Sequence, residues 1–109
     1  MQEETKNEPT KTYDAGKERL DLLPWDILSD LSRIYEKGAE KYERDNWRKG
    51  MSWSRCFACA MRHLTKWFMG ESIDPESGLS HLQHACFRVI QLMYYEKSKQ
   101  EFDDRSKNA

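Results

Sequence analysis

The stretch Trp67-Phe-Met-Gly-Glu-Ser-Ile-Asp-Pro-Glu-Ser-Gly-Leu-Ser-His-Leu-Gln-His84 decides the fold of this 109-residue chain, because it joins two helix-like segments through a turn. Gly70 follows the apolar pattern of the upstream segment, where a glycine ends a helix well. The Pro-Glu-Ser-Gly run then marks the turn. Ser80 and Gln83 form a Ser-x-x-Gln capping box that opens the next helix. The sequence therefore predicts two helices joined at this stretch.

Both flanking segments carry apolar residues at helical spacing. The upstream helix begins at the cap residue Ser52 and ends at Gly70. The downstream helix contains a single formal charge, Arg88, between residues 78 and 95, so we expect it to be covered on more than one face, inside a bundle or at a subunit interface. The stripes expected in the core are Phe57, Met61, Leu64 and Phe68 upstream, and Leu82, Ala85, Cys86, Val89 and Met93 downstream.

A further helix is predicted over about residues 26–43, after Pro24, with apolar residues at Ile27, Leu28, Leu31, Ile34, Tyr35 and Tyr42. Residues 1–12 are polar and are expected to form a disordered tail. Beyond Glu96 the chain is charged and loses its pattern, so residues 97–109 are expected to fray. No strand-like alternation is present. The sequence thus predicts an all-α domain over residues 13–96, with three main helices in a compact bundle completed by oligomerisation.

The composition excludes several classes of protein. Lysine and arginine number 18 against 19 acidic residues, and no basic stripe favours a nucleic-acid partner. No apolar run is long enough to span a membrane, and the first nine residues are too acidic for a signal peptide, so a cytoplasmic location is expected. The three cysteines do not make a disulfide framework. Cys56, Cys59 and His63 share one helical stripe, which leaves a zinc site open beside the alternative of small buried thiols.

Two pairs of carboxylates have spacings that suit a divalent ion. Glu40 and Glu43 lie one turn apart on the first helix, and Glu71 and Asp74 follow the second. Such pairs can share Mg²⁺ ions, which in turn hold a polyphosphate. The alternative for Glu40 and Glu43 is a solvated helix face.

Histidines and cations near the turn suggest a site for an anion or for proton transfer. His81 and His84, three residues apart, can point into the same space. His63 fits either a half-buried structural histidine or a catalytic or phosphate-binding one. Trp47 and Tyr42 could stack on a base or simply anchor their turn. The candidate phosphate contacts are Lys17, Arg19, Lys41 and Arg62.

Several blocks together resemble the phage-associated dATP/dGTP diphosphohydrolase N-terminal-domain family, a relative of the MazG-like all-α nucleotide pyrophosphohydrolases. The blocks are Tyr13-Asp-Ala-Gly-Lys17, Arg19-Leu-Asp-Leu-Leu-Pro24, Gly38-Ala-Glu-Lys-Tyr42 with Asn46-Trp47, Arg62-His-Leu64, Gly70-Glu71, Asp74-Pro-Glu-Ser-Gly78 and His81-Leu-x-His-Ala85. The resemblance covers about residues 13–96.

The resemblance implies an oligomeric, metal-dependent enzyme that splits a (deoxy)nucleoside triphosphate into monophosphate and pyrophosphate. It assigns metal and acid/base roles to Glu71, Asp74, Glu76, His81 and His84, with Glu40 as the first-helix carboxylate. Lys17, Arg19, Lys41, Asn46 and Arg62 would face the substrate. Two features depart from the pattern: Pro75 and Gly78 place the second carboxylate pair beside a turn, and Arg88 brings a cation close to the histidines.

We therefore expect a hydrolase in which Mg²⁺ or Mn²⁺, bound by Glu71, Asp74, Glu40 and His84, activates a water for attack at the α-phosphorus. His63 or His81, with Glu76, would handle protons, and Trp47 and Arg88 join the substrate contacts. The rival hypothesis is a phage protein that sequesters a nucleotide immune signal without metal, using Arg62, Arg88 and the histidines. A helical interaction module without a small ligand is the third.

Overall fold

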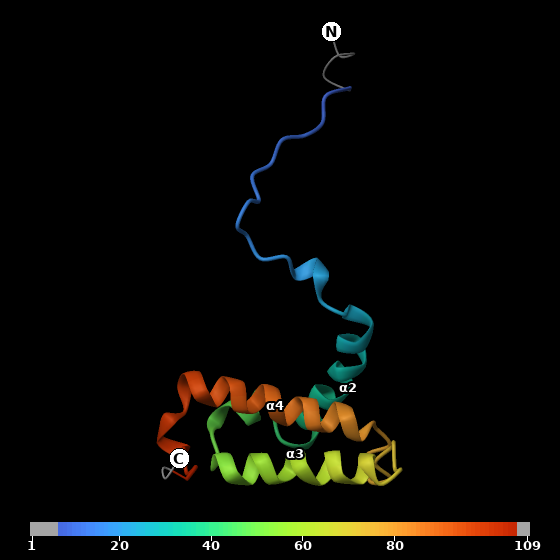
Figure 1. The fold of residues 1–109 in the computed structure, drawn as a ribbon, viewed down its shortest axis with the longest axis vertical. Coiled ribbons are helices and arrows are strands. Elements are labelled where there is room, and N and C mark those ends of the chain that lie inside the picture. Colours follow the sequence, from blue (N-terminus) through green and yellow to red (C-terminus); the bar gives the residue numbers. More distant parts are fainter. Residues whose placement is uncertain (1–6, 107–109) are drawn as a thin grey trace.

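The computed structural model describes residues 7–106, which form three α-helices and three short 3-10 turns (Figure 1). The helices are α2 (Trp25–Lys41), α3 (Trp53–Phe68) and α4 (His81–Ser98), and the turns are η1 (Leu20–Leu22), η2 (Asn46–Lys49) and η3 (Gln100–Phe102). Within this part of the chain, the extended pairing consists of one isolated antiparallel bridge, Ile73 with Ser80. The expected all-α class with three main helices is confirmed, with each helix boundary shifted by a residue or two.

Helices α3 and α4 run antiparallel and form the body of the molecule (Figure 1). Small residues line their contact: Cys56 and Ala60 are buried on α3, and Ala85 is buried on α4. Small side chains let two helix backbones approach closely and exclude water between them. At the far end of the pair, the indole nitrogen of Trp53 donates a hydrogen bond of 3.1 Å to the carbonyl of Lys99, which ties the start of α3 to the end of α4.

Helix α2 and turn η2 cover another face of α4. Leu31 and Ile34 of α2 are buried. Four aromatic rings meet edge to face at centroid distances of 4.9 to 6.2 Å, an arrangement that favours the ring quadrupoles; they belong to Tyr35, Trp47, Phe87 and Tyr94. The expectation that α4 is covered on more than one face is therefore confirmed. No helix among the described residues is long and apolar enough to cross a membrane.

The apolar stripes expected in the core of α3 and α4 are the main error of the sequence analysis. Ala85 is the one member that is buried; the others are exposed, namely Phe57, Met61, Leu64, Phe68, Leu82, Cys86, Val89 and Met93. The buried side of α4 is instead its polar stripe, with His81 and Gln91 at 0% and 2% exposure. Burial of these polar groups is tolerated because each finds hydrogen-bond partners inside the fold.

The ends of the helix pair also differ from expectation. Ser52 occupies the N-cap position of α3, but its side chain makes no capping bond. Instead the Asp104 carboxylate accepts a 2.9 Å hydrogen bond from the backbone nitrogen of Ser54. Gly50 has a positive φ of 113°, and a Cβ there would collide with the ring of Phe102. Lys99, Phe102 and Asp104 therefore contact the start of α3 or the residues just before it. Residues 107–109, like residues 1–6 of the expected tail, lie outside the described part.

Residues 7–24 form an arm that extends away from the helical body (Figure 1). Every residue from 7 to 27 is exposed. The molecule measures 67 × 35 × 30 Å and has a Cα radius of gyration of 20.3 Å, whereas a globular domain of this size has about 13 Å. The expected compact bundle therefore describes the body but not the arm.

Candidate functional site

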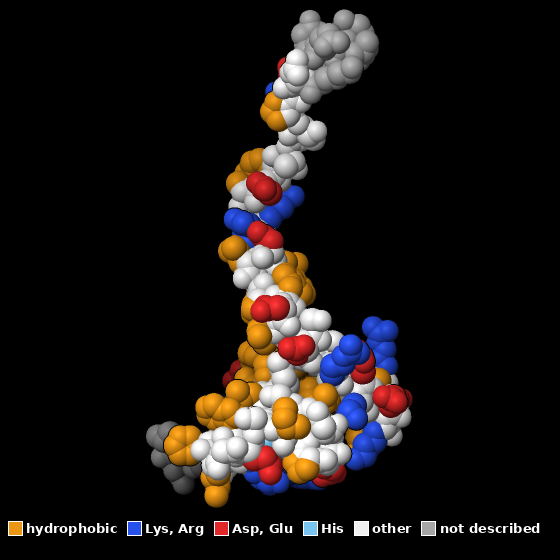
Figure 2. Space-filling model, turned by 90° about the vertical axis from the view of Figure 1, so that its right-hand side faces the viewer, with side chains coloured by type: hydrophobic (Ala, Val, Ile, Leu, Met, Phe, Trp, Pro, Cys, Tyr) orange, Lys and Arg blue, Asp and Glu red, His pale blue; other side chains and the backbone are white. Residues whose placement is uncertain are grey.

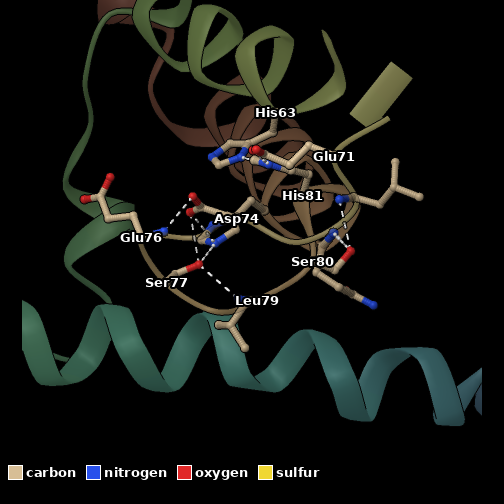
Figure 3. A network of polar contacts seen from close by, with 11 residues as sticks. His63, Glu71, Asp74, Glu76, Ser77, Leu79, Ser80 and His81 are labelled. Carbon is tan, nitrogen blue, oxygen red and sulfur yellow. Dashed lines mark hydrogen bonds and ion pairs between the residues drawn. The ribbon is translucent and has the colours of Figure 1, made fainter. Parts of the chain in front are cut away.

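A hydrogen-bonded turn between α3 and α4 builds the candidate site (Figure 3). The Asp74 backbone nitrogen donates to the carbonyl of Leu79 at 2.8 Å, and the Gly78 nitrogen donates to the carbonyl of Asp74 at 2.7 Å. Gly78 has φ 76°, a left-handed conformation that glycine adopts without strain. The Asp74 carboxylate also accepts from the Glu76 nitrogen at 3.1 Å. These bonds fix the acidic turn beside the start of α4.

The first turn of α4 fixes where its histidines point. The Ser80 hydroxyl accepts from the nitrogens of Leu82 and Gln83 at 3.1 and 3.4 Å, so the predicted cap is confirmed. The Gln83 side chain donates to the carbonyl of Ile27 on α2 at 3.4 Å instead of closing the capping box. Because His81 and His84 lie one helical turn apart, both project from the same side of this rigid first turn towards α3.

Glu71, His81 and His63 form a hydrogen-bonded chain that runs from the turn to α3. The fully buried His81 places Nε2 at 2.7 Å from Glu71 Oε1 and Nδ1 at 2.9 Å from His63 Nδ1. A carboxylate only accepts hydrogen bonds, so His81 Nε2 carries the proton of that contact. With one proton on its ring, His81 accepts through Nδ1 from His63 Nδ1–H. The chain therefore leaves the lone pair of His63 at Nε2.

His84 is held by a second, shorter chain. The Ser77 hydroxyl donates to Asp74 Oδ2 at 3.0 Å and lies 2.7 Å from His84 Nε2, while Asp74 Oδ2 itself lies 3.5 Å from that nitrogen. The hydroxyl donates its one proton to the carboxylate, so it accepts a hydrogen bond from His84 Nε2–H. Burial acts to raise the pKa of Asp74, but hydrogen bonds from the Glu76 nitrogen and the Ser77 hydroxyl outweigh it and lower that pKa. The free lone pair of His84 is thus at Nδ1.

The two chains meet where the rings of His63 and His84 stack, with centroids 4.4 Å apart and planes inclined by 6°. Burial, followed by the neighbouring His84 and His81, lowers the pKa of His63 to about 4. Burial also lowers the pKa of His84, against the opposing effect of Asp74. At neutral pH, His63 is therefore an uncharged imidazole with an available lone pair.

The lone pairs of both rings reach the surface. Within residues 7–106, no buried side-chain nitrogen or oxygen lacks a hydrogen-bond partner. His63 Nε2 and His84 Nδ1 make none of the hydrogen bonds of the described part, so neither nitrogen is buried. The stacked pair therefore offers two proton-accepting nitrogens to solvent, beside the acidic turn.

Arg88 supplies positive charge next to this pair. Its guanidinium is half-buried on α4, donates to Gln91 Oε1 at 2.9 Å, and contributes to lowering the pKa values of His63 and His84. No carboxylate of residues 7–106 lies within ion-pair distance of it. A half-buried arginine without an acidic partner favours an anion such as a phosphate.

The predicted metal ligands do not gather into one set. Asp74 and His84 adjoin, and Glu71 pairs with His81 instead. Glu40 is exposed near the end of α2. Within the described part, no three His, Cys, Asp or Glu side chains are placed to hold a metal ion. Glu76, predicted to act in proton transfer, contributes its backbone nitrogen to the turn, and Figure 3 shows its carboxylate directed away from the histidines.

The predicted substrate contacts are scattered. Lys17 and Arg19 lie on the arm, where Arg19 forms an ion pair with Asp21 at 2.7 Å. Lys41 lies over the Tyr42 ring, and Arg62 donates to Cys59 Sγ at 3.1 Å. Asn46 and Trp47 belong to η2, where the Trp47 ring is packed in the aromatic cluster and anchors its turn. Of the seven, Arg88 is the one whose charge contributes to lowering the pKa values of His63 and His84.

Cys56 follows the buried-thiol alternative, whereas Cys59 is half-buried and Cys86 is exposed. All three are free. Cys56 Sγ contacts the carbonyl of Arg88 at 3.4 Å and Gln91 Oε1 at 3.3 Å, and burial raises the pKa of its thiol to about 11. A thiol of that kind is neither a good nucleophile nor a ready metal ligand.

Ser77 is the site residue that the sequence analysis missed. Its hydroxyl joins Asp74 to His84 and also accepts from the Leu79 nitrogen at 3.2 Å. The available signal was its position three residues after Asp74, because an aspartate in a turn commonly accepts hydrogen bonds from residues two and three further on.

A family model and a phage relative that match this chain carry the same description. The model of a protein family described as "dATP/dGTP diphosphohydrolase, N-terminal" matches residues 7–105. A Salmonella phage PMBT28 protein named dATP/dGTP diphosphohydrolase is 28% identical over 97 residues, which cover 89% of this chain and 33% of that protein. The chain thus spans about a third of the length of this curated relative. No solved structure matches it.

Proposed function

Because the chain belongs to the dATP/dGTP diphosphohydrolase N-terminal family, we propose that it binds a purine deoxynucleoside triphosphate and hydrolyses it to monophosphate and pyrophosphate. The resemblance seen in the sequence blocks is confirmed at the level of the family. The reaction is taken from the name of the relative. That this chain acts on the same substrates by the same reaction is the proposal.

The observation that carries the proposal is the chain from Glu71 through His81 to His63, which ends at a solvent-facing nitrogen. Hydrolysis requires a base that removes a proton from the attacking water, and an uncharged imidazole is suited to that role at neutral pH. Glu71 and His81 would orient the His63 ring and stabilise the positive charge that it gains. We assign His63 Nε2 as the general base and His81 as a positioning residue.

Arg88 supports the substrate side of the proposal. A triphosphate carries several negative charges, and Arg88 is a half-buried cation beside the stacked histidines that no carboxylate of residues 7–106 neutralises. Its remaining N–H groups would bind phosphate oxygens. The same charge adds a minor contribution to the effect of burial in lowering the pKa of His63, so one residue would serve both phosphate binding and the state of the base.

The proposal includes a divalent ion, Mg²⁺ or Mn²⁺, that arrives with the nucleotide. Within residues 7–106, the side chains do not form a complete metal site. Mg²⁺ in nucleotide enzymes is commonly bound by one or two carboxylates together with substrate phosphates, so a complete protein site is not required. Glu71, whose side chain is 47% exposed, and Asp74 are the carboxylates in reach of such an ion. When bound, it would neutralise phosphate charge.

The direct test is pyrophosphate release from dATP and dGTP by the purified chain, with Mg²⁺, with Mn²⁺ and with chelator. We expect release with a metal and a large loss in the His63→Gln variant, whose side chain keeps a hydrogen-bond donor but lacks the basic nitrogen. Lys66→Gln is the matched control, because Lys66 lies one turn further along α3 and is exposed. Equal rates in wild type and His63→Gln would refute the assignment of the base.

A second candidate function is binding without turnover, in which the chain sequesters a nucleotide. One observation favours it: within residues 7–106, no three metal-binding side chains are placed to hold an ion. Calorimetry against dATP and dGTP in chelator, followed by chromatography of the recovered ligand, separates the two functions. Tight binding with intact ligand, and no pyrophosphate with either metal, would select sequestration.

A further inference from the structure

The exposed stripes on α3 and α4 form one continuous apolar face. On α3, Cys56 and Ala60 face α4, and the residue directly after each of them, Phe57 and Met61, is exposed. On α4, Ala85 faces α3, and the next residue, Cys86, is exposed. Because the two helices are antiparallel, this equal offset places both stripes on the same side of the pair. We call this the apolar face: Phe57, Met61, Leu64 and Phe68 of α3, with Leu82, Cys86, Val89 and Met93 of α4.

The apolar face is too large to be an ordinary exposed surface. Its side chains are 36% to 85% exposed, with Phe68 at the upper limit, and none of its eight residues carries a charge. Contiguous exposed apolar surface of this kind marks a site of association rather than contact with water. In Figure 2 hydrophobic side chains also line the arm and one edge of the helical body, while lysine and arginine gather at the opposite edge.

The arm is the second apolar surface without a partner. Leu20, Leu22 and Leu23 are 58%, 71% and 44% exposed, and Trp25 and Ile27 at the start of α2 are 56% and 52% exposed. The arm nevertheless has a defined shape. The Trp25 indole donates to the carbonyl of Leu20 at 2.9 Å, and a short 3-10 turn presents the leucines.

The arm belongs to the folded unit, although it does not contact the body of its own chain. The family match begins at residue 7 and therefore includes it. It points away from α3 and α4 of its own chain (Figure 1). A segment that keeps its shape while exposing leucines and a tryptophan needs a surface supplied by another molecule.

We propose that the arm of one chain docks on the apolar face of a second copy, and that the exchange is reciprocal and closes a two-fold dimer. Both surfaces expose clustered apolar side chains and so match in chemistry, and the Arg19–Asp21 ion pair borders the leucines of the arm. Exchange of identical segments is a common route to closed dimers. A stable interface takes about 20–30 residues a side, and the thirteen apolar residues named above would form its centre. This inference does not depend on hydrolysis.

Complementation between two variants tests the exchange. The arm variant is Leu20→Asp with Leu22→Asp, and the face variant is Met61→Glu with Val89→Glu. All four positions are exposed, so neither variant disturbs the core; circular dichroism verifies this. We expect the wild-type chain to sediment as a dimer and each variant alone as a monomer. An equimolar mixture should recover dimers, because the intact arm of one variant can dock on the intact face of the other.

Each alternative gives a different result. A wild-type chain that stays monomeric at 100 µM, on the order of the concentrations at which weak dimers form, would overturn the proposal. A dimer that survives in the arm variant would mean that faces pair with each other. Two monomeric variants that do not recover dimers on mixing would also exclude exchange. Lys66→Glu, an exposed change on α3 outside the apolar face, is the control and should remain dimeric.

Discussion

The two ends of the α3–α4 pair both bury polar side chains, but they satisfy them differently. At the end that holds Tyr95, hydrogen bonds finish on backbone carbonyls: the Tyr95 hydroxyl donates to the carbonyl of Trp47 at 2.7 Å, and the Trp53 indole donates to that of Lys99. At the histidine end they finish on the carboxylates of Glu71 and Asp74.

This difference indicates which of the two buried networks can take part in proton transfer. A backbone carbonyl neither gains nor loses a proton and cannot move independently, so the Tyr95 end joins α4 to η2 and holds the fold. A carboxylate paired with an imidazole can stabilise a change of charge. The histidine end also leaves two ring nitrogens open to solvent, whereas the Tyr95 hydroxyl is 2.6 Å from Gln91 Nε2 and fully enclosed. Both ends therefore bury polar groups, but only at the histidine end do the hydrogen-bonded chains finish on groups that can gain or lose a proton.

The largest effect that separates the two ends should be on hydrolysis. We expect His63→Gln to lower pyrophosphate release by a factor of about 10² to 10⁴, the usual contribution of a positioned general base. Thermal unfolding should change little, because His63 is only half-buried. Tyr95→Phe should leave the rate unchanged. If Tyr95→Phe reduces the rate as much as His63→Gln, the proposed division between the ends is wrong.

The next largest effect should be on stability at the histidine end. His81→Ala removes a fully buried ring and leaves His63 Nδ1 and Glu71 without their partner. We expect the free energy of unfolding to fall by about 2–4 kcal/mol in urea titrations, since a cavity and lost hydrogen bonds add. Glu71→Gln keeps an acceptor for His81 Nε2–H and should have a much smaller effect on stability; a loss as large as that of His81→Ala would contradict the tautomer assigned here.

Tyr95→Phe should have a smaller effect on stability. The change leaves the ring packed but removes the hydroxyl between Gln91 and the Trp47 carbonyl. We expect a loss of about 1–2 kcal/mol, because Gln91 Nε2 loses its 2.6 Å acceptor and the Trp47 carbonyl keeps only a 3.4 Å hydrogen bond from that nitrogen. The m-value of the urea transition should not change. An undiminished free energy of unfolding would show that water replaces the hydroxyl.

A further effect is the dependence of stability on pH. The pKa of His63 is about 4 in the folded chain and 6.5 for an ordinary histidine, so between these values the unfolded chain binds a proton that the folded chain does not. The free energy of unfolding should therefore have its full value above pH 6.5 and should fall as the pH drops towards 4. His84, whose pKa is also lowered, acts in the same direction, and the lowered pKa of Asp74 adds a loss below its ordinary 3.8.

A variant at the histidine end isolates this dependence. Urea titrations from pH 7 to pH 4 should give a shallower slope for His63→Gln than for the wild type, because one of the titrating groups is gone. Tyr95→Phe should shift the whole curve down and keep the slope. Parallel curves for wild type and His63→Gln would mean that His63 titrates normally in the fold.

Much of the fold could be read from local signals in the chain. Ser80 determined where α4 begins, and Gly78 marked a turn that requires a positive φ. The periodicity of apolar residues located all three helices. It did not identify the buried faces, because Met61 and Val89 look like core residues by their chemistry, whereas the contact between α3 and α4 selects small residues such as Ala60 and Ala85.

The candidate site was only partly accessible for the same reason. The sequence pointed to the acidic turn with His81 and His84, since these lie close together in the chain, and separately to His63 on the preceding helix. It could not show that Glu71 pairs with His81 rather than with a metal, or that the rings of His63 and His84 stack. Those pairings depend on how α3 and α4 are rotated against each other.

The sequence by itself determined the helices, the turn and the family, because caps, glycines and short motifs act over a few residues. Tertiary structure alone decided which nitrogen of each histidine is free, which helix faces are buried and which remain exposed for a partner. Those outcomes depend on distances between residues far apart in the chain, such as His63 and His81, and no local pattern specifies such distances.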